Sequence, residues 1–315
     1  MKAVFLFSGS GLRYTYHAGV YQAFLEAFPG AEKRFIGVSG GSIVAVAAAN
    51  GLTGRDILEI TLESVADDYG ALLDKGFVLD EDGAIDFKSI LRSVDIRISD
   101  FLYLLLPDGK KKLASRLFSR LKEKALFGTM DRFKETLSKY LNRTNLEDPT
   151  IGVVATNINT GEAETLKIFP GVDPVPPCAA SCSIPFVFPA EEIFGEYYSD
   201  GGVADRSGFS ALTEMANSWG WNNEDFLRVV SEARPPLGSV LDIDSSIDTL
   251  NRTYLILTSG SRYLDTESGT TITIKNEIGS PGPYDVKRDS LLRSFDIGYI
   301  KGKRSFESIK DSGLV

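Results

Sequence analysis

The stretch Phe35-Ile36-Gly37-Val38-Ser39-Gly40-Gly41 sets the pattern G-x-S-x-G between a short apolar run and an alanine-rich segment. The apolar residues predict a buried strand, and residues 43–49 predict a helix. A strand, a sharp turn between small neighbours and a helix whose N-terminus faces the serine form a nucleophile elbow. The stretch therefore predicts an α/β fold with Ser39 as a candidate nucleophile, its turn permitted by Gly37, Gly40 and Gly41.

The chain contains a single histidine, and its position limits how Ser39 could be activated. Hydrolases of the α/β type with a Ser-His-Asp triad carry the histidine after the serine and the acid. His17 instead precedes Ser39 and lies at the start of a predicted helix, where we expect it to cap or to pack. A nucleophilic Ser39 therefore needs a base other than the histidine of a conventional triad.

The composition indicates an ordinary globular protein. Of 315 residues, 43% are hydrophobic and 24% charged, which provides ample material for a core. The net charge of −9 argues against a nucleic-acid partner, which would require a surplus of Lys and Arg. The apolar run at residues 3–7 is too short for a signal peptide, and no stretch is long enough to span a membrane. We expect a cytoplasmic protein, at most peripheral at membranes.

No metal or cofactor is expected. One histidine and no carboxylate cluster at ligand spacing argue against a metal site. Cys178 and Cys182 have no histidine neighbours for a zinc site and are too few for a disulfide framework. We interpret them as reduced, partly buried thiols.

Strand and helix patterns alternate along the chain with short connections. This order is typical of a mainly parallel sheet covered on both faces, a three-layer α/β/α sandwich. We expect a single catalytic domain over residues 1–315, with residues of about 70–130 as a candidate lid or membrane-contact insertion. Strands are predicted at residues 3–7, 35–38, 151–158, 163–169 and 226–231, and helices after residues 13, 42 and 53 and at the C-terminus.

Two further glycine-containing segments flank predicted strands. Ser8-Gly9-Ser10-Gly11-Leu12-Arg13 follows the first strand and precedes a helix. Backbone N–H groups of such a loop can converge on a developing oxyanion. Asp200-Gly201-Gly202 places a carboxylate at a strand end, before a tight turn. Together with the elbow, these segments supply the parts of one acyl-transfer site.

In this order, the three segments resemble the patatin-like phospholipase family, which combines a glycine-rich oxyanion loop, a G-x-S-x-G elbow and an Asp-Gly-Gly motif. Residues 156–161 and 179–189 also resemble the family's mid-sheet strand and turn and its stretch before Asp-Gly-Gly. The resemblance covers about residues 3–210. It implies a patatin-like fold and a Ser-Asp dyad that works without histidine.

By position, the resemblance implies that Ser39 is the nucleophile and Asp200 its base and orienting partner. A solvated carboxylate with a pKa near 4 is a poor base for a hydroxyl, so burial must raise the pKa of Asp200. The apolar approach through residues 184–188 could provide that burial. The remaining implied site residues are Ser10, Gly11 and Leu12 as oxyanion-hole donors, Arg13 as a brace or phosphate contact, and Gly9, Gly201 and Gly202 as support.

Several positions depart from the family pattern. Ser10 stands at the loop's second glycine and Tyr14 at its last position, while Arg206 and Ser207 stand where Asn and Pro often follow Asp-Gly-Gly. These departures concern the mouth of the site more than the dyad. They keep a catalytically inactive patatin-like protein as an alternative.

Residues 101–124 run against the acidic average of the chain. Apolar residues 101–106 precede a Lys/Arg-rich stretch in which Leu113, Leu117 and Leu121 lie at helical spacing. A basic amphipathic helix beside an apolar stretch suits peripheral contact with an anionic membrane. The alternative is a solvated helix that covers the sheet.

These features predict a lipid acyl hydrolase of the phospholipase A or lysophospholipase type, acting on a phospholipid or other lipid ester. A malonyl-type acyltransferase is disfavoured because Val38 stands where those elbows carry a histidine. A nucleotide-binding protein is the other alternative. Against it, Gly9-Ser10-Gly11 lacks the third glycine of the dinucleotide fingerprint, and no G-K-S/T follows either loop.

Overall fold

The computed structural model describes residues 1–73, 130–141, 151–185, 188–233, 269–276 and 287–313. Nearly all of the candidate insertion at residues 70–130, and the whole basic segment 101–124, lie outside these residues. The expectations for both segments therefore stay predictions.

The described strands form one eight-stranded mixed sheet in the order β5-β6-β3-β2-β1-β7-β8, with β4 paired to β3. The pairs β3-β2, β2-β1, β1-β7 and β7-β8 are parallel, whereas β3-β4, β3-β6 and β5-β6 are antiparallel. The predicted parallel core is confirmed, and its antiparallel extension was not anticipated. The strands are β1 (Lys2–Phe7), β2 (Glu32–Val38), β3 (Ile151–Asn157), β4 (Ala163–Ile168), β5 (Glu191–Ile193), β6 (Glu196–Asp200), β7 (Leu227–Glu232) and β8 (Thr271–Lys275).

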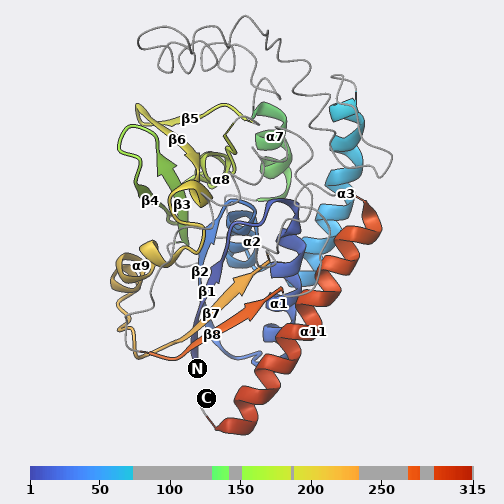
Figure 1. Ribbon diagram of the computed structural model, residues 1–315, viewed down its shortest axis with the longest axis vertical. Coiled ribbons are helices and arrows are strands. Elements are labelled where there is room, and N and C mark those ends of the chain that lie inside the picture. The colour runs from blue at the N-terminus through green and yellow to red at the C-terminus, as the bar shows by residue number, and fades with distance from the viewer. Residues whose placement is uncertain (74–129, 142–150, 186–187, 234–268, 277–286, 314–315) are drawn as a thin grey trace, which may run out of the picture.

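Helices cover both faces of this sheet, which confirms the predicted three-layer α/β/α architecture (Figure 1). On one face lie α1 (Tyr14–Ala27), α2 (Gly40–Ala49), α3 (Gly54–Leu73) and α11 (Arg288–Ser312). The opposite face is covered by α9 (Leu212–Trp219), preceded by the 3-10 turn η4 (Phe209–Ala211). Beside the antiparallel strands lie α7 (Asp131–Tyr140) and α8 (Val175–Ser181).

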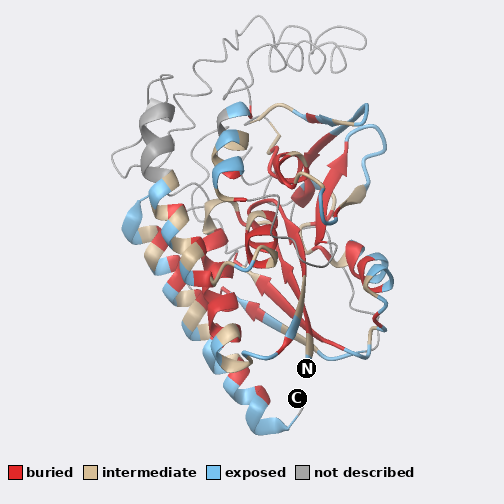
Figure 2. Cartoon of the chain, turned by 180° about the vertical axis from the view of Figure 1, so that it is seen from behind, coloured by how far each residue is buried: buried red, intermediate tan, exposed pale blue. Residues whose placement is uncertain are grey.

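Strand β1 shows why the sequences of the central strands are continuous apolar runs. Phe5 and Phe7 belong to the cluster under α1 and α2, while Val4 and Leu6 belong to the cluster under α9. Successive side chains of a strand point to opposite faces, so a strand covered on both sides has no polar positions. Figure 2 shows the central strands largely buried and the edge strands partly exposed, whereas the long C-terminal helix is buried only along its inner side.

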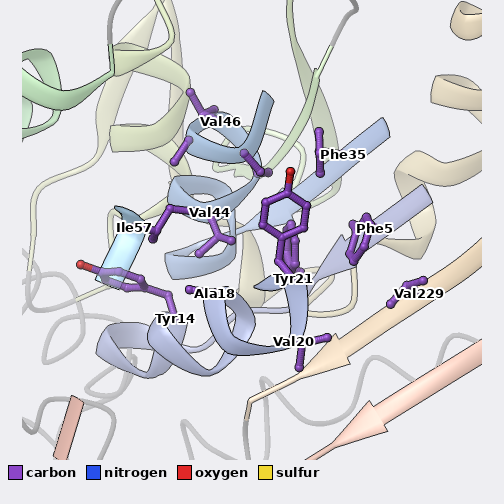
Figure 3. Packing of buried hydrophobic residues seen from close by; sticks show 14 of the residues in the cluster. Phe5, Tyr14, Ala18, Val20, Tyr21, Phe35, Val44, Val46, Ile57 and Val229 are labelled. Atoms are coloured by element: carbon purple, nitrogen blue, oxygen red, sulfur yellow. The ribbon is translucent and has the colours of Figure 1, made fainter. Parts of the chain in front are cut away.

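Aromatic rings join the first helix to the sheet (Figure 3). The ring of Tyr21 on α1 meets Phe5 edge-on at 5.4 Å between centroids and Phe35 at 5.7 Å. Edge-to-face pairs of this kind add about 1 kcal/mol beyond the burial of their area. The apolar residues of β1, β2 and α1 therefore form the centre of the larger core.

Helices α1 and α11 approach each other closely enough for backbone contact. A Cβ added to Gly19 would lie 2.1 Å from the carbonyl oxygen of Phe295, and one added to Gly298 would lie 2.1 Å from that of Tyr16. Glycine at both positions is thus a packing requirement, despite its cost of about 1 kcal/mol in a helix interior.

Other features of the structure concern a helix cap, the two cysteines and the length of the helices. Thr53 and Asp56 form a reciprocal capping pair at the start of α3, since the N–H of Asp56 donates to Thr53 Oγ1 and that of Thr53 to Asp56 Oδ2. Cys178 and Cys182 are free and buried. No helix within the described part of the chain is both long and apolar enough to cross a membrane.

The α1–α11 contact predicts the effect of a single methyl group. Gly298→Ala should lower the free energy of unfolding by about 1–3 kcal/mol, because the new Cβ overpacks against the α1 backbone. Urea unfolding measures this loss. Gly30→Ala is the control, since a Cβ there meets nothing within 4 Å. Equal stability of the Gly298→Ala variant and wild type would contradict the observed helix contact.

Candidate active site

Ser39 sits in a strained turn between β2 and α2. Its φ of 52° and ψ of −130° place it in the left-handed region that non-glycine residues rarely adopt. Strain of this kind costs about 1–3 kcal/mol and persists only where the surroundings enforce it. The Ser39 carbonyl accepts hydrogen bonds from Ser42 N (2.8 Å) and Ser42 Oγ (2.6 Å), which anchors the turn to the first turn of α2. The geometry is that of a nucleophile elbow.

The motif glycines allow the backbone segments around the elbow to touch. A Cβ on Gly37 would lie 2.5 Å from the carbonyl oxygen of Gly41, and one on Gly41 would lie 2.2 Å from the carbonyl oxygen of Phe7. No side chain fits in either place. Gly40 in turn packs against the glycine loop, 2.3 Å from the Gly11 carbonyl oxygen when a Cβ is added.

The glycine loop after β1 lies directly over Ser39. A Cβ on Gly9 would be 3.7 Å from Ser39 Cβ. The 3-10 turn η1 (Gly11–Arg13) follows, closed by a bond from Arg13 N to the Ser10 carbonyl at 3.3 Å. Within the described residues, the N–H groups of Ser10, Gly11 and Leu12 donate to no protein acceptor. Three unpaired donors thus lie in the loop that covers the elbow.

Strand β3 brings Ser39 and Asp200 together. Strand β4 occupies one edge of β3 from Ile151 to Thr156, so β2 and β6 must share the other edge. Strand β2 ends with Val38 opposite Val154, and β6 ends with Asp200 opposite Ala155. Val38 and Asp200 therefore pair with consecutive residues of one edge of β3, which brings Ser39, the residue after Val38, next to Asp200.

The backbone around Asp200 is fixed on both sides. Its N–H donates to the Ser183 carbonyl at 2.9 Å, and its carbonyl accepts from Thr156 Oγ1 at 2.8 Å. The next residues form the 3-10 turn η3 (Gly201–Val203). Gly201 packs on β3, where a Cβ would lie 2.1 Å from the Val154 carbonyl oxygen.

The two carboxyl oxygens of Asp200 have different surroundings. Oδ1 accepts the N–H of Gly202 at 2.8 Å. Oδ2 is buried and has no hydrogen-bond partner among the described residues. The Ser39 hydroxyl lies near enough to the carboxyl to oppose the rise of its pKa. The site thus contains a buried proton acceptor with one unused oxygen beside a serine.

Burial dominates the electrostatics of this carboxyl. Desolvation raises the pKa of Asp200 from 3.8 to about 6, against the opposing effects of the Ser39 hydroxyl and the Gly202 N–H. At neutral pH the carboxyl is ionised but far more basic than a solvated aspartate. A general base is most effective when its pKa lies near the working pH.

Ser181 supports the elbow, although sequence reasoning assigned it no role. Its hydroxyl accepts the N–H of Ser39 at 2.7 Å and donates to the Val154 carbonyl at 2.6 Å. It therefore ties the elbow to β3. The sequence signal was a serine directly after Ala179-Ala180 in a mostly apolar segment, since a buried hydroxyl must find hydrogen-bond partners.

Asp205 organises the loop after Asp-Gly-Gly and was also missed. Its Oδ1 accepts the N–H of Ser207 at 2.8 Å and that of Gly208 at 3.2 Å, and its Oδ2 accepts the N–H of Ser210 at 2.9 Å. Asp followed by Ser two residues later is a typical sequence for such a turn.

Arg206, one of the departures from the family pattern, connects this loop to the glycine loop. Its carbonyl accepts the N–H of Gly9 at 2.9 Å, and its Cγ lies 3.0 Å from a Cβ placed on Gly9. Arg13, by contrast, closes η1, and both of its suggested roles stay predictions.

The described residues contain no group of three or more His, Cys, Asp or Glu side chains arranged to hold a metal ion.

Comparison with solved structures finds distant similarity to two bacterial proteins. VipD from Legionella pneumophila is 14% identical with a TM-score of 0.42, and the match covers 98% of this chain and 66% of VipD. ExoU from Pseudomonas aeruginosa, in complex with SpcU, is 12% identical with a TM-score of 0.38, over 98% of this chain and 52% of that chain. The chain therefore spans less than two thirds of either protein. No curated protein matches the sequence.

The family comparison is more direct. The profile described as patatin-like phospholipase matches residues 5–213, more than half of the chain, including the glycine loop, the elbow and Asp-Gly-Gly. On this evidence the chain belongs to the patatin-like phospholipase family.

Proposed function

We propose that this protein is a lipid acyl hydrolase of the phospholipase A or lysophospholipase type, with Ser39 as nucleophile and Asp200 as base. One observation carries the proposal: the shared edge of β3 sets a strained serine beside a buried carboxylate whose Oδ2 has no other partner. Family membership supports lipid esters as the substrate class.

In the first half of the reaction, Ser39 Oγ attacks the ester carbonyl while Asp200 Oδ2 takes its proton. Charge develops on the carbonyl oxygen, and the N–H groups of Ser10, Gly11 and Leu12 are the donors proposed to stabilise it. Collapse of the tetrahedral intermediate breaks the ester bond, and Asp200 returns the proton to the leaving alkoxide. The product is an acyl-Ser39 ester and a free alcohol.

In the second half, Asp200 takes a proton from a water molecule that attacks the acyl-Ser39 carbonyl. The same donors stabilise the second tetrahedral intermediate. Its collapse releases the fatty acid, and the proton returns from Asp200 to Ser39 Oγ. The cycle requires neither a histidine nor a cofactor, consistent with a chain whose only histidine is fully buried.

The basic segment at residues 101–124 completes the proposal as a peripheral contact with an anionic membrane. A lipid hydrolase must reach a substrate held in a bilayer, and the acidic average of the chain disfavours approach to anionic lipid. A local surplus of Lys and Arg would offset this repulsion.

Replacement of the proposed nucleophile should abolish the reaction. Ser39→Ala should lose hydrolysis of phospholipid and lysophospholipid esters and labelling by a fluorophosphonate probe, because no other hydroxyl occupies the elbow. Mass spectrometry locates the label. The control is Ser218→Ala, at an exposed serine on α9, which should label like wild type. Undiminished labelling or turnover in Ser39→Ala would contradict the proposed Ser39–Asp200 dyad.

The pKa of Asp200 predicts the acid limb of the pH profile. Because the base must be ionised to accept a proton, kcat/KM should fall about tenfold per pH unit below about 6. The other group that ordinarily titrates nearby, His17, has its pKa lowered to about 3 by burial. Hydrolysis of an uncharged ester between pH 4.5 and 8.5 measures the limb. A flat profile from pH 7 to 5 would exclude Asp200 as base.

The raised pKa also predicts that the carboxylate lowers stability. The favourable contribution of neutral Asp200 is fully present below pH 3.8 and is lost as pH rises through about 6. The difference between a pKa of 3.8 and one of about 6 corresponds to about 3 kcal/mol. Asp200→Asn should therefore be inactive yet more stable than wild type at pH 8, by up to about 3 kcal/mol, with no gain at pH 4. Urea unfolding at both pH values tests this; a variant less stable at pH 8 contradicts it.

A further inference from the structure

The only histidine of the chain lies beneath the glycine loop and makes two hydrogen bonds. His17, on α1, is fully buried. Its Nε2 is 2.9 Å from the carbonyl oxygen of Ser8, the first residue of the loop. Its Nδ1 is 2.8 Å from Ser231 Oγ, on the neighbouring strand β7. The ring therefore connects the loop to the sheet.

The partners determine the protonation state of this ring. A carbonyl oxygen can only accept, so Nε2 carries the proton and donates to Ser8. Burial lowers the pKa of His17 to about 3, so the ring is neutral and Nδ1 has a free lone pair. The Ser231 hydroxyl must then donate to Nδ1. With both nitrogens engaged inside the fold, His17 is unable to serve as a base for Ser39.

These bonds hold the peptide that begins the glycine loop. The Ser8 carbonyl and the Gly9 N–H belong to one planar unit. The carbonyl is held by His17, and the N–H donates to the Arg206 carbonyl at 2.9 Å. The Ser8 N–H donates to the Ser231 carbonyl at 3.1 Å. Rotation of the plane would break two bonds at once, so the chain leaves β1 in a single direction.

We propose that His17, with Ser231, is a positioning residue that holds the Ser8–Gly9 peptide so that the donors of Ser10, Gly11 and Leu12 face the reacting carbonyl over Ser39. The inference rests on the proposed function of the loop. The rings of Phe7 and Tyr16, at 5.6 and 6.1 Å from the imidazole, fix its place in the core. The histidine thus acts through the loop and never touches substrate.

The size of the expected effect follows from the role of preorganised donors. Loss of one oxyanion donor typically costs about 100- to 1000-fold in kcat, and a displacement of about 1 Å can cost about 100-fold. The donors act on the transition state and contribute little to substrate binding. A displaced loop therefore lowers kcat and leaves KM nearly unchanged.

Three variants of the full chain test the proposal by steady-state hydrolysis of a lysophospholipid. His17→Leu should lose about 100-fold in kcat with KM within about threefold of wild type. His17→Gln keeps an N–H donor near the Nε2 position and should recover to within about tenfold of wild type. Thr15→Val is the matched control, since Thr15 is fully buried on the same helix and its hydroxyl has no partner among the described residues. It should match wild-type kcat.

NMR supplies a readout that does not depend on activity. Because the chain has one histidine, its ¹⁵N ring signals need no assignment by mutation. They should show Nε2 protonated and Nδ1 bare, with Nδ1 alone shifted in Ser231→Ala. The amide signals of residues 9–13 should move in His17→Leu and return toward wild type in His17→Gln.

The outcomes separate this inference from the proposed function. Wild-type kcat in a folded His17→Leu, while Ser39→Ala is inactive, overturns the positioning role and leaves the dyad intact. Absence of any lipid hydrolysis by wild type overturns the proposed function; the NMR comparison then still tests the loop. Unmoved amide signals at residues 9–13 in His17→Leu, or a ring protonated at Nδ1, overturn the inference in either case.

Discussion

The site depends on a constraint of strand pairing: a strand has two edges, and β3 has three partners. Because β4 runs along one whole edge, β2 and β6 must meet end to end on the other. Strand β2 arrives there parallel to β3 and leads into α2. Strand β6 arrives antiparallel to β3 and leads into the 3-10 turn η3. The meeting point is where Ser39 and Asp200 stand. The antiparallel extension of the sheet is thus the feature that supplies the carboxylate.

Around this point the fold accepts costs that a purely structural element would avoid. Ser39 adopts a left-handed conformation, and Asp200 is buried. Within the part of the chain that the structure describes, Asp200 Oδ2 and donors of the glycine loop have no hydrogen-bond partner. Each costs stability, and each contributes to the proposed reaction: the elbow conformation of the serine, a more basic carboxylate and donors for the oxyanion. The surrounding structure is correspondingly well bonded, with Ser181, Thr156 and Asp205 all hydrogen-bonded to the backbone near the site.

Much of this could be predicted from local sequence, and the remainder depended on long-range pairing. Short apolar runs located β1, β2, β3 and β7, and the ordered motifs placed Ser39 and Asp200 among the candidates. The meeting of β2 and β6 on one edge of β3 was beyond local patterns, because Val38 and Asp200 are far apart in the chain. The role of Ser181 was missed for the same reason. Its hydroxyl acts through hydrogen bonds with the Val154 carbonyl and the Ser39 N–H, and no sequence spacing connects these residues.

His17 shows how a residue type can mislead when chemistry is assigned by composition alone. A single histidine beside a candidate serine hydrolase invites the role of general base, yet burial removes its basicity and its partners occupy both nitrogens. Meanwhile the aspartate, ordinarily too weak a base, has its pKa raised by the same physical effect. Desolvation disfavours the charged form of either group, which makes a histidine less basic and a carboxylate more so. In the proposed mechanism burial therefore exchanges the usual roles of the two residues: Asp200 transfers the proton, and His17 positions the glycine loop.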